Sequence, residues 1–102
     1  MPTTTYDADI LGMLIIDPSL IRYAEPRISP EDFADRWHQS TYAALIVLSR
    51  LGQQIDLYNL RRQMHAPDWI MPSLINMIDA APDCLHAEAI IDEWVRYVRG
   101  EQ

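Results

Sequence analysis

At 102 residues, the chain is long enough for one domain with a buried core. Hydrophobic residues make up 49% and charged residues 23%, a balance typical of a folded globular protein rather than a disordered one. The net charge of -7, with eight arginines and no lysine, argues against direct nucleic-acid binding, because modules that bind phosphate backbones normally present a basic patch.

The chain is expected to divide into a disordered N-terminus at 1–5, a helical domain over 6–99 and a tail at 100–102. The first helix is predicted over about 6–16, because its apolar residues recur at the spacing of one helix face. Gly12 lies inside this helix, where glycine is unfavourable. Its presence predicts that another helix packs close against the backbone there.

After the first helix, two N-cap residues are each followed directly by a proline. Asp17 is the expected N-cap of a short second helix with proline at its first position, and Pro26 ends that helix. The segment 29–32 repeats the pattern as a shorter form of the capping box. The helical turn that it begins is expected to place Phe33, the single phenylalanine, in the core.

The most apolar stretch of the chain lies in the helix predicted between Asp35 and Gly52. Residues 43–48 are apolar on every side of that helix, a pattern that predicts a central helix surrounded by other elements. Asp35 is the expected N-cap, and Gly52 is expected to adopt the left-handed geometry of a helix terminus. We therefore expect the bundle to pack around this helix.

The C-terminal half predicts three more helices. Asp56 caps the first of them, and the second is expected to begin at about Met71, which makes Pro72 tolerable in its first turn. The third carries an amphipathic stripe that begins at Ala87. The sequence contains no β-branched run of alternating polarity. The predicted fold class is all-α, a compact orthogonal bundle of about six or seven short helices.

The last helix carries the surface that we single out for binding. Its apolar stripe is wider than packing on a small core requires, although core packing is the simpler interpretation of such a stripe. The alternative is that its outer edge is a protein–protein interface, since tryptophan, tyrosine and arginine are enriched at interface hot spots. The candidate interface residues are Ile91, Trp94, Val95, Arg96, Tyr97, Val98 and Arg99.

We find no catalytic, cofactor or metal site in the sequence. The three histidines lack the spacing of metal ligands, and we expect a local hydrogen bond for His38 rather than a role as a base. Acidic residues gather where helices begin, which capping explains, and the other acids are expected on the solvated surface. Without lysine, the phosphate-binding loop of nucleotide hydrolases cannot form. We therefore expect neither an enzyme nor a bound cofactor.

Cys84 is the single cysteine, so no disulfide can form within the chain. Its neighbours provide no strongly cationic setting, and we expect a structural thiol rather than a nucleophile. A lone thiol fits a reducing compartment. No apolar run approaches the roughly 18 residues of a membrane span. The expected location is cytoplasmic.

Taken together, these motifs resemble the N-terminal domain of the bacterial replicative helicase of the DnaB type. The matching segments are 10–14 with 17–18, 28–33, 38 with 41–43, and 48 with 52–56 and 60. The structural signature within them is Gly12, Asp17, Phe33, His38, Tyr42, Gly52, Ile55 and Asp56. The resemblance covers about 7–99 and departs at 64–69, which replaces a longer connection that contains glycine in the family.

This resemblance implies a non-catalytic module. In such helicases the domain forms a collar, pairs with neighbouring copies and docks the helicase-interaction domain of primase, while the ATPase lies in a separate domain. The family's helical hairpin for dimerisation would begin near the end of this chain, so self-association would use the last helix or another face. The expected partners are primase, replicative helicase subunits or a second copy, with no nucleic acid and no membrane.

Several alternatives stay open. The chain is either a fragment of a full helicase or a complete short protein, and a free-standing accessory or mobile-element protein would imitate the collar to modulate the host helicase or primase. The helicase-binding domain of primase has a similar helical fold, although the segment 52–56 favours the helicase side. A small DNA-binding regulator would need a basic recognition helix. The best candidate, 57–64 with Arg61 and Arg62, is short and starts from an acid.

Overall fold

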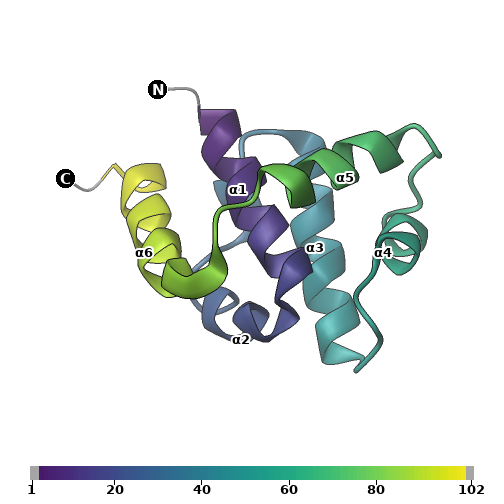
Figure 1. The fold of residues 1–102 in the computed structure, drawn as a ribbon, viewed down its shortest axis with the longest axis horizontal. Coiled ribbons are helices and arrows are strands. Elements are labelled where there is room, and N and C mark those ends of the chain that lie inside the picture. The colour runs from purple at the N-terminus through teal and green to yellow at the C-terminus, as the bar shows by residue number, and fades with distance from the viewer. Residues whose placement is uncertain (1–2, 101–102) are drawn as a thin grey trace.

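The computed structural model describes residues 3–100, and helices are the regular secondary structure in this part of the chain. They are α1 (Thr3–Ile16), α2 (Ile21–Ala24), α3 (Arg36–Arg50), α4 (Leu57–Met64), α5 (Ile70–Ala80) and α6 (Ala87–Val98), with the single 3-10 turns η1 (Pro18–Leu20), η2 (Pro30–Asp32) and η3 (Cys84–His86). The predicted all-α fold class is confirmed. Figure 1 shows α6 and α4 at opposite ends of the longest dimension, with α1 and α3 between them.

The centre of the bundle is α1, not α3 as predicted. Residues 10–15 of α1 are all buried, because α3, α5 and α6 pack around them (Figure 1). In α3, by contrast, Ala43 and Val47 are exposed, so one side of its apolar stretch faces solvent. Single exposed alanine or valine side chains are normal on protein surfaces. An apolar circumference therefore does not require burial on every side.

Gly12 lies where α1 crosses α5 at close range. A Cβ atom at this position would fall on the backbone carbonyl oxygen of Met77 and lie 2.8 Å from the Cβ atom of Ala81, closer than packed atoms approach. The predicted close approach is confirmed. The missing side chain of Gly12 lets the backbone of α5 pack directly against α1.

The predicted helix caps are present. Asp17, Asp35 and Asp56 each accept a backbone N–H of the helix that they precede, at 3.3, 2.7 and 2.8 Å. The carboxylate of Asp32 accepts the backbone N–H of Ser29 at 2.8 Å, as expected for the acid of a capping box. Each bond satisfies a donor that a free helix end leaves unpaired.

Three helices end at a residue in the left-handed conformation, α3 at Gly52, α4 at His65 and α6 at Gly100. Gly52 follows α3 with a φ of 70°, and the N–H of Gln53 donates to the carbonyl of Leu48 at 3.0 Å, as predicted for a glycine terminator. His65 occupies the same position after α4 with a φ of 53°. A residue with a Cβ atom loses roughly 1–2 kcal/mol in this conformation. The end of α4 is therefore strained, whereas the end of α3 is not.

The ends of two helices differ from their predicted positions. α1 begins at Thr3, three residues earlier than expected and within the segment predicted to be disordered. Residues 1–2 and 101–102 lie outside the described residues, and the predictions made for them stay predictions. α5 begins at Ile70, one residue before the expected start, so Pro72 lies in its first turn, where its missing N–H has no partner to lose.

An aromatic cluster joins η2, α3 and α6. The ring centroid of Phe33 lies 5.2 Å from that of Tyr42 and 4.8 Å from that of Trp94, and all three side chains are buried. The hydroxyl of Tyr42 donates to the carbonyl of Ile28 at 2.8 Å. Burial, together with two nearby carboxylates, raises the pKa of Tyr42 above its ordinary value, so the hydroxyl stays protonated as a donor. The predicted core position of Phe33 is confirmed.

Candidate interaction surface

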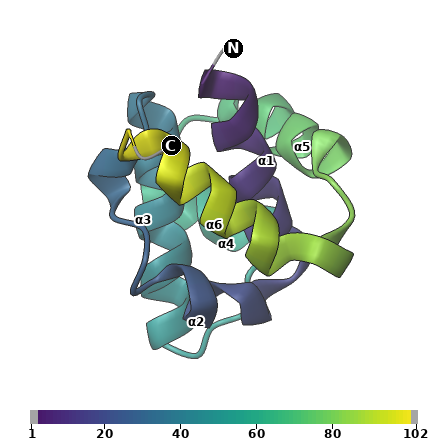
Figure 2. The same ribbon diagram turned by 90° about the vertical axis from the view of Figure 1, so that its left-hand side faces the viewer.

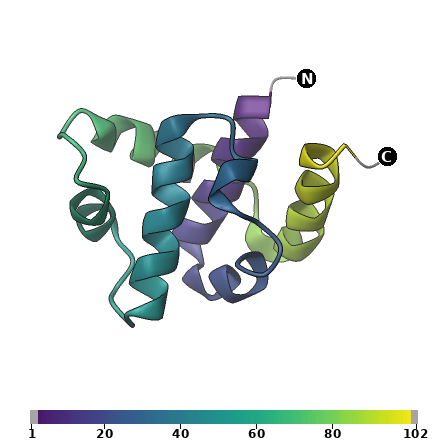
Figure 3. The same ribbon diagram turned by 180° about the vertical axis from the view of Figure 1, so that it is seen from behind.

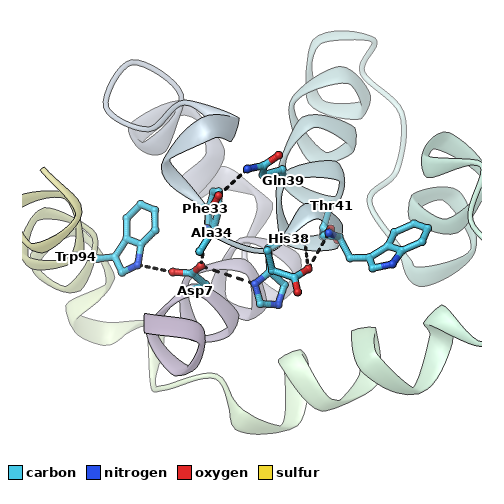
Figure 4. A network of polar contacts seen from close by, with 9 residues as sticks. Asp7, Phe33, Ala34, His38, Gln39, Thr41 and Trp94 are labelled. Atoms are coloured by element: carbon cyan, nitrogen blue, oxygen red, sulfur yellow. Dashed lines mark hydrogen bonds and ion pairs between the residues drawn. The ribbon is translucent and has the colours of Figure 1, made fainter. Parts of the chain in front are cut away.

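Asp7, on α1, is a buried charged residue that joins three segments of the chain (Figure 4). Its side chain is 1% exposed. Its Oδ1 accepts the indole N–H of Trp94 at 3.1 Å, and its Oδ2 accepts the backbone N–H of Ala34 at 3.3 Å. These donors compensate for the loss of water around the carboxylate. The expectation that acids outside the caps lie on the solvated surface is wrong for Asp7.

His38 approaches the same carboxylate from the first turn of α3. Its Nδ1 lies 3.8 Å from Oδ2 of Asp7, beyond hydrogen-bond range, and is buried without a hydrogen-bond partner. Its backbone N–H donates locally, to Asp35 at 3.2 Å. The Nδ1 atom of His38 thus makes no local hydrogen bond, and the local bond at this residue is the backbone one that caps α3.

The inner half of the predicted interface on α6 belongs to the core. Ile91 and Trp94 are fully buried, so their side chains offer no surface to a partner, contrary to the prediction. Trp94 packs on Phe33 and donates its N–H to Asp7. The stripe on α6 is wide because this helix packs against both the η2 segment and α1, and the contact with α1 depends on a buried acid that the sequence pattern did not reveal.

Polar contacts fix α6 to the segment around α2. The guanidinium of Arg99 donates to the carbonyl of Arg27 at 2.8 Å and lies 3.4 Å from the carboxylate of Asp32. Within α6 itself, the carboxylate of Asp92 accepts the hydroxyl of Tyr23 at 2.7 Å, and this hydrogen bond raises the pKa of Tyr23. Arg99, a predicted interface residue, is therefore engaged within the chain.

Five of the seven predicted interface residues lie at the surface, and one of these, Arg99, is engaged within the chain. Arg96 and Tyr97 are exposed, Tyr97 by 46%, and Val95 and Val98 are half-buried at the edge of the core. They form the last turn of α6, which crosses the front of the molecule in Figure 2. We call Val95, Arg96, Tyr97 and Val98 the α6 surface.

Residues 3–100 bring together no group of three or more histidine, cysteine, aspartate or glutamate side chains placed to hold a metal ion. Burial, with the carboxylates of Asp17 and Asp83, raises the pKa of the half-buried Cys84 thiol, which supports its interpretation as a structural thiol. In the same part of the chain, no helix is both long and apolar enough to cross a membrane.

The residues predicted as a structural signature are parts of the scaffold. Most of them cap helices, end a helix, fill the core or allow α1 to approach α5. The remaining one, Ile55, is half-buried and packs against the core. Among these signature residues, His38, beside the buried Asp7, has a buried side-chain nitrogen without a hydrogen-bond partner.

Comparison with known proteins relates the chain to replicative helicases. The family model of the DnaB-like helicase N terminal domain matches residues 4–96. The chain is 23% identical over 103 residues to the replicative DNA helicase DnaC of Bacillus subtilis (strain 168), which covers 91% of the chain and 23% of that helicase. It is 31% identical over 84 residues to the replicative DNA helicase DnaB of Treponema pallidum (strain Nichols), covering 78% and 19%. The chain thus spans less than a quarter of either relative.

Proposed function

Because this chain belongs to the family of DnaB-like helicase N-terminal domains, we propose that it is a non-catalytic protein-interaction module of DNA replication. Its proposed partners are the subunits of a replicative helicase and the helicase-interaction domain of primase. The observation that carries the proposal is the family match over 4–96, which covers nearly the whole chain. Both similar helicases are named as replicative enzymes, and each is several times longer than this chain.

The α6 surface supports this role because it combines exposure with rigid attachment. Tyr97 and Arg96 are of the residue types enriched at interface hot spots, and both are exposed. The helix that carries them is anchored by Trp94, which packs on Phe33 and bonds to Asp7. A surface that is already ordered loses little conformational entropy when a partner binds.

We also propose that this chain alone does not hydrolyse ATP, because it has no lysine for a phosphate-binding loop. A free-standing accessory protein that imitates the helicase collar is the alternative form of the same role. It would use the same kind of partner. The coding sequence separates the two, since a RecA-like domain encoded in frame downstream identifies a helicase fragment.

Size-exclusion chromatography with light scattering tests the proposal. The chain is mixed with the primase helicase-interaction domain from the same genome and, separately, with the replicative helicase. A complex whose mass is the sum of its parts is expected with at least one of them. If both partners elute unchanged at concentrations well above micromolar, the proposed function is wrong, although the fold is unaffected.

A pair of tyrosine variants locates the contact. Tyr97→Ala should weaken the complex by about tenfold, the loss of a moderate hot spot. Tyr58→Ala removes another exposed tyrosine, on α4 at the opposite end of the molecule, and should leave the affinity within about twofold (Figure 1). Equal losses in the two variants would argue against a contact at the α6 surface.

A further inference from the structure

A hollow of about 580 Å³ is lined by residues of α4 and its flanking segments. Figure 3 shows α4 at the end of the molecule opposite α6. The polar lining of the hollow consists of Gln53, Asn59, Arg61, Arg62, Gln63 and His65. Two guanidinium groups and one imidazole thus line this hollow, and no acidic residue does. In a chain with a net charge of -7, this is a local reversal of sign within a concave surface.

Arg61 already holds a carboxylate at the edge of this hollow. Its Nη1 lies 3.3 Å from Oδ1 of Asp68 and 3.4 Å from the carbonyl oxygen of Ala66. The Arg61 side chain is 28% exposed, whereas that of Asp68 is 93% exposed. An ion pair with so exposed an acid is weak and exchangeable. The Arg61 guanidinium thus lies beside a carboxylate at the edge of the hollow, and an incoming carboxylate would replace that of Asp68.

Two further hydrogen-bond donors line the hollow, Arg62 on α4 and His65 at the end of that helix. The guanidinium carbon of Arg62 lies 5.5 Å from the centroid of the Tyr58 ring, which orients it while its N–H groups remain able to donate. His65 holds the strained left-handed backbone at the end of α4. Strained residues cluster at binding and catalytic sites, where the surrounding structure maintains them.

We propose that this hollow binds the carboxylate side chains of an acidic protein segment. The fork of a guanidinium matches the two oxygens of a carboxylate, and two forks on successive residues allow two acids of one segment to bind. A short segment needs only local positive charge. A DNA duplex, by contrast, would bring a long array of phosphates against a protein of net negative charge. This site is separate from the α6 surface and does not depend on the function proposed for it.

Fluorescence anisotropy with the whole chain tests the site. The probe is a labelled short peptide that alternates glutamate and leucine, and its control replaces every glutamate by glutamine. The glutamate peptide should bind and the glutamine peptide should not. Inorganic phosphate should compete, because it offers the same oxygen geometry to guanidinium groups. A labelled DNA duplex of similar length is the third ligand.

Two charge reversals make the matched comparison. Arg62→Glu should lower the affinity for the glutamate peptide by at least about tenfold, through the loss of one charge-assisted contact and the gain of a repulsion. Arg22→Glu makes the same change of net charge at an exposed position of α2 outside the hollow and should change it by less than about twofold. Circular dichroism verifies that both variants are folded.

Three results would each overturn the proposal. One is equal loss of affinity in both variants, which would mean diffuse attraction without a site. Another is tighter binding of the DNA duplex than of the glutamate peptide, which would favour a DNA-binding role for α4. The third is equal affinity for the glutamate and glutamine peptides, which would remove the carboxylate from the recognition.

Discussion

The indole N–H of Trp94 donates to the carboxylate of Asp7 across 87 positions of sequence, and this bond ties the first helix of the fold to the last (Figure 4). It is buried at both ends. A buried carboxylate that lost its donors would keep its desolvation cost without compensation. The bond therefore fixes the position of α6, and with it the α6 surface.

Asp7→Ala should destabilise the chain by about 2 kcal/mol. The substitution leaves the N–H groups of Trp94 and Ala34 without their acceptor. The free-energy cost of these unpaired donors exceeds the gain from no longer burying a carboxylate. Urea denaturation followed by circular dichroism measures the change in the free energy of unfolding. Asp7→Asn keeps an acceptor oxygen at the same place and should lose less.

The double variant Asp7→Ala, Trp94→Phe tests whether the two residues act through one bond. Each single change breaks the same hydrogen bond, so together they should cost at least about 1 kcal/mol less than the sum of the separate losses. Strict additivity would mean that the bond contributes nothing to stability. Trp94→Phe keeps an aromatic ring beside Phe33, which limits the loss of packing.

Gly12→Ala should destabilise the chain by about 1–3 kcal/mol, since the added methyl group meets the backbone of α5. In an exposed helix the same change would stabilise by about 1 kcal/mol, so the sign of the effect is the test. The thermal midpoint measures it. Adding Ala81→Gly removes one of the clashing atoms but not the carbonyl of Met77, and should restore only part of the loss.

His65→Gly should raise the free energy of unfolding by up to about 1 kcal/mol, because glycine adopts a φ of 53° without strain, although its freedom in the unfolded chain offsets part of the gain. Gly52→Ala is the mirror experiment. Its φ is 70° and a Cβ atom there would meet nothing within 4 Å, so strain alone should cost about 1 kcal/mol. A loss of stability in His65→Gly would contradict the assignment of strain.

Cys84 should react slowly with iodoacetamide, because the thiolate is the reactive form and burial raises the pKa of this thiol. A raised pKa keeps the group protonated to higher pH. The alkylation rate should therefore rise with pH in both states, and the midpoint of this rise should lie at a higher pH in the folded chain than in the urea-denatured chain. A midpoint at or below that of the denatured chain would indicate an activated cysteine instead of a structural one.

Sequence patterns predicted the features of this fold that depend on neighbouring residues. Asp35 caps a helix whose first N–H groups lie two and three positions away, and Gly52 ends the same helix through bonds to residues just before it. Gly12 was recognisable because glycine is unfavourable within a helix. Each of these is determined within a few residues of sequence.

What the sequence did not predict depends on contacts between distant segments. The burial of Asp7 follows from donors 27 and 87 positions away, and no local pattern distinguishes this acid from a solvated one. Trp94, which bonds to Asp7, and Ile91 both lie in the core, so the predicted interface is reduced to the last turn of α6. Which of two apolar helices occupies the centre is likewise decided by how the other helices pack around them.

Nuclear magnetic resonance of the isotope-labelled chain, titrated with the primase helicase-interaction domain, tests the role of the α6 surface most directly. The amide signals of Val95, Arg96, Tyr97 and Val98 should shift or broaden first and most strongly. Signals from α4 should stay unchanged at the same partner concentration. Binding that perturbs other elements and leaves the last turn of α6 unaffected would contradict the role proposed for the α6 surface.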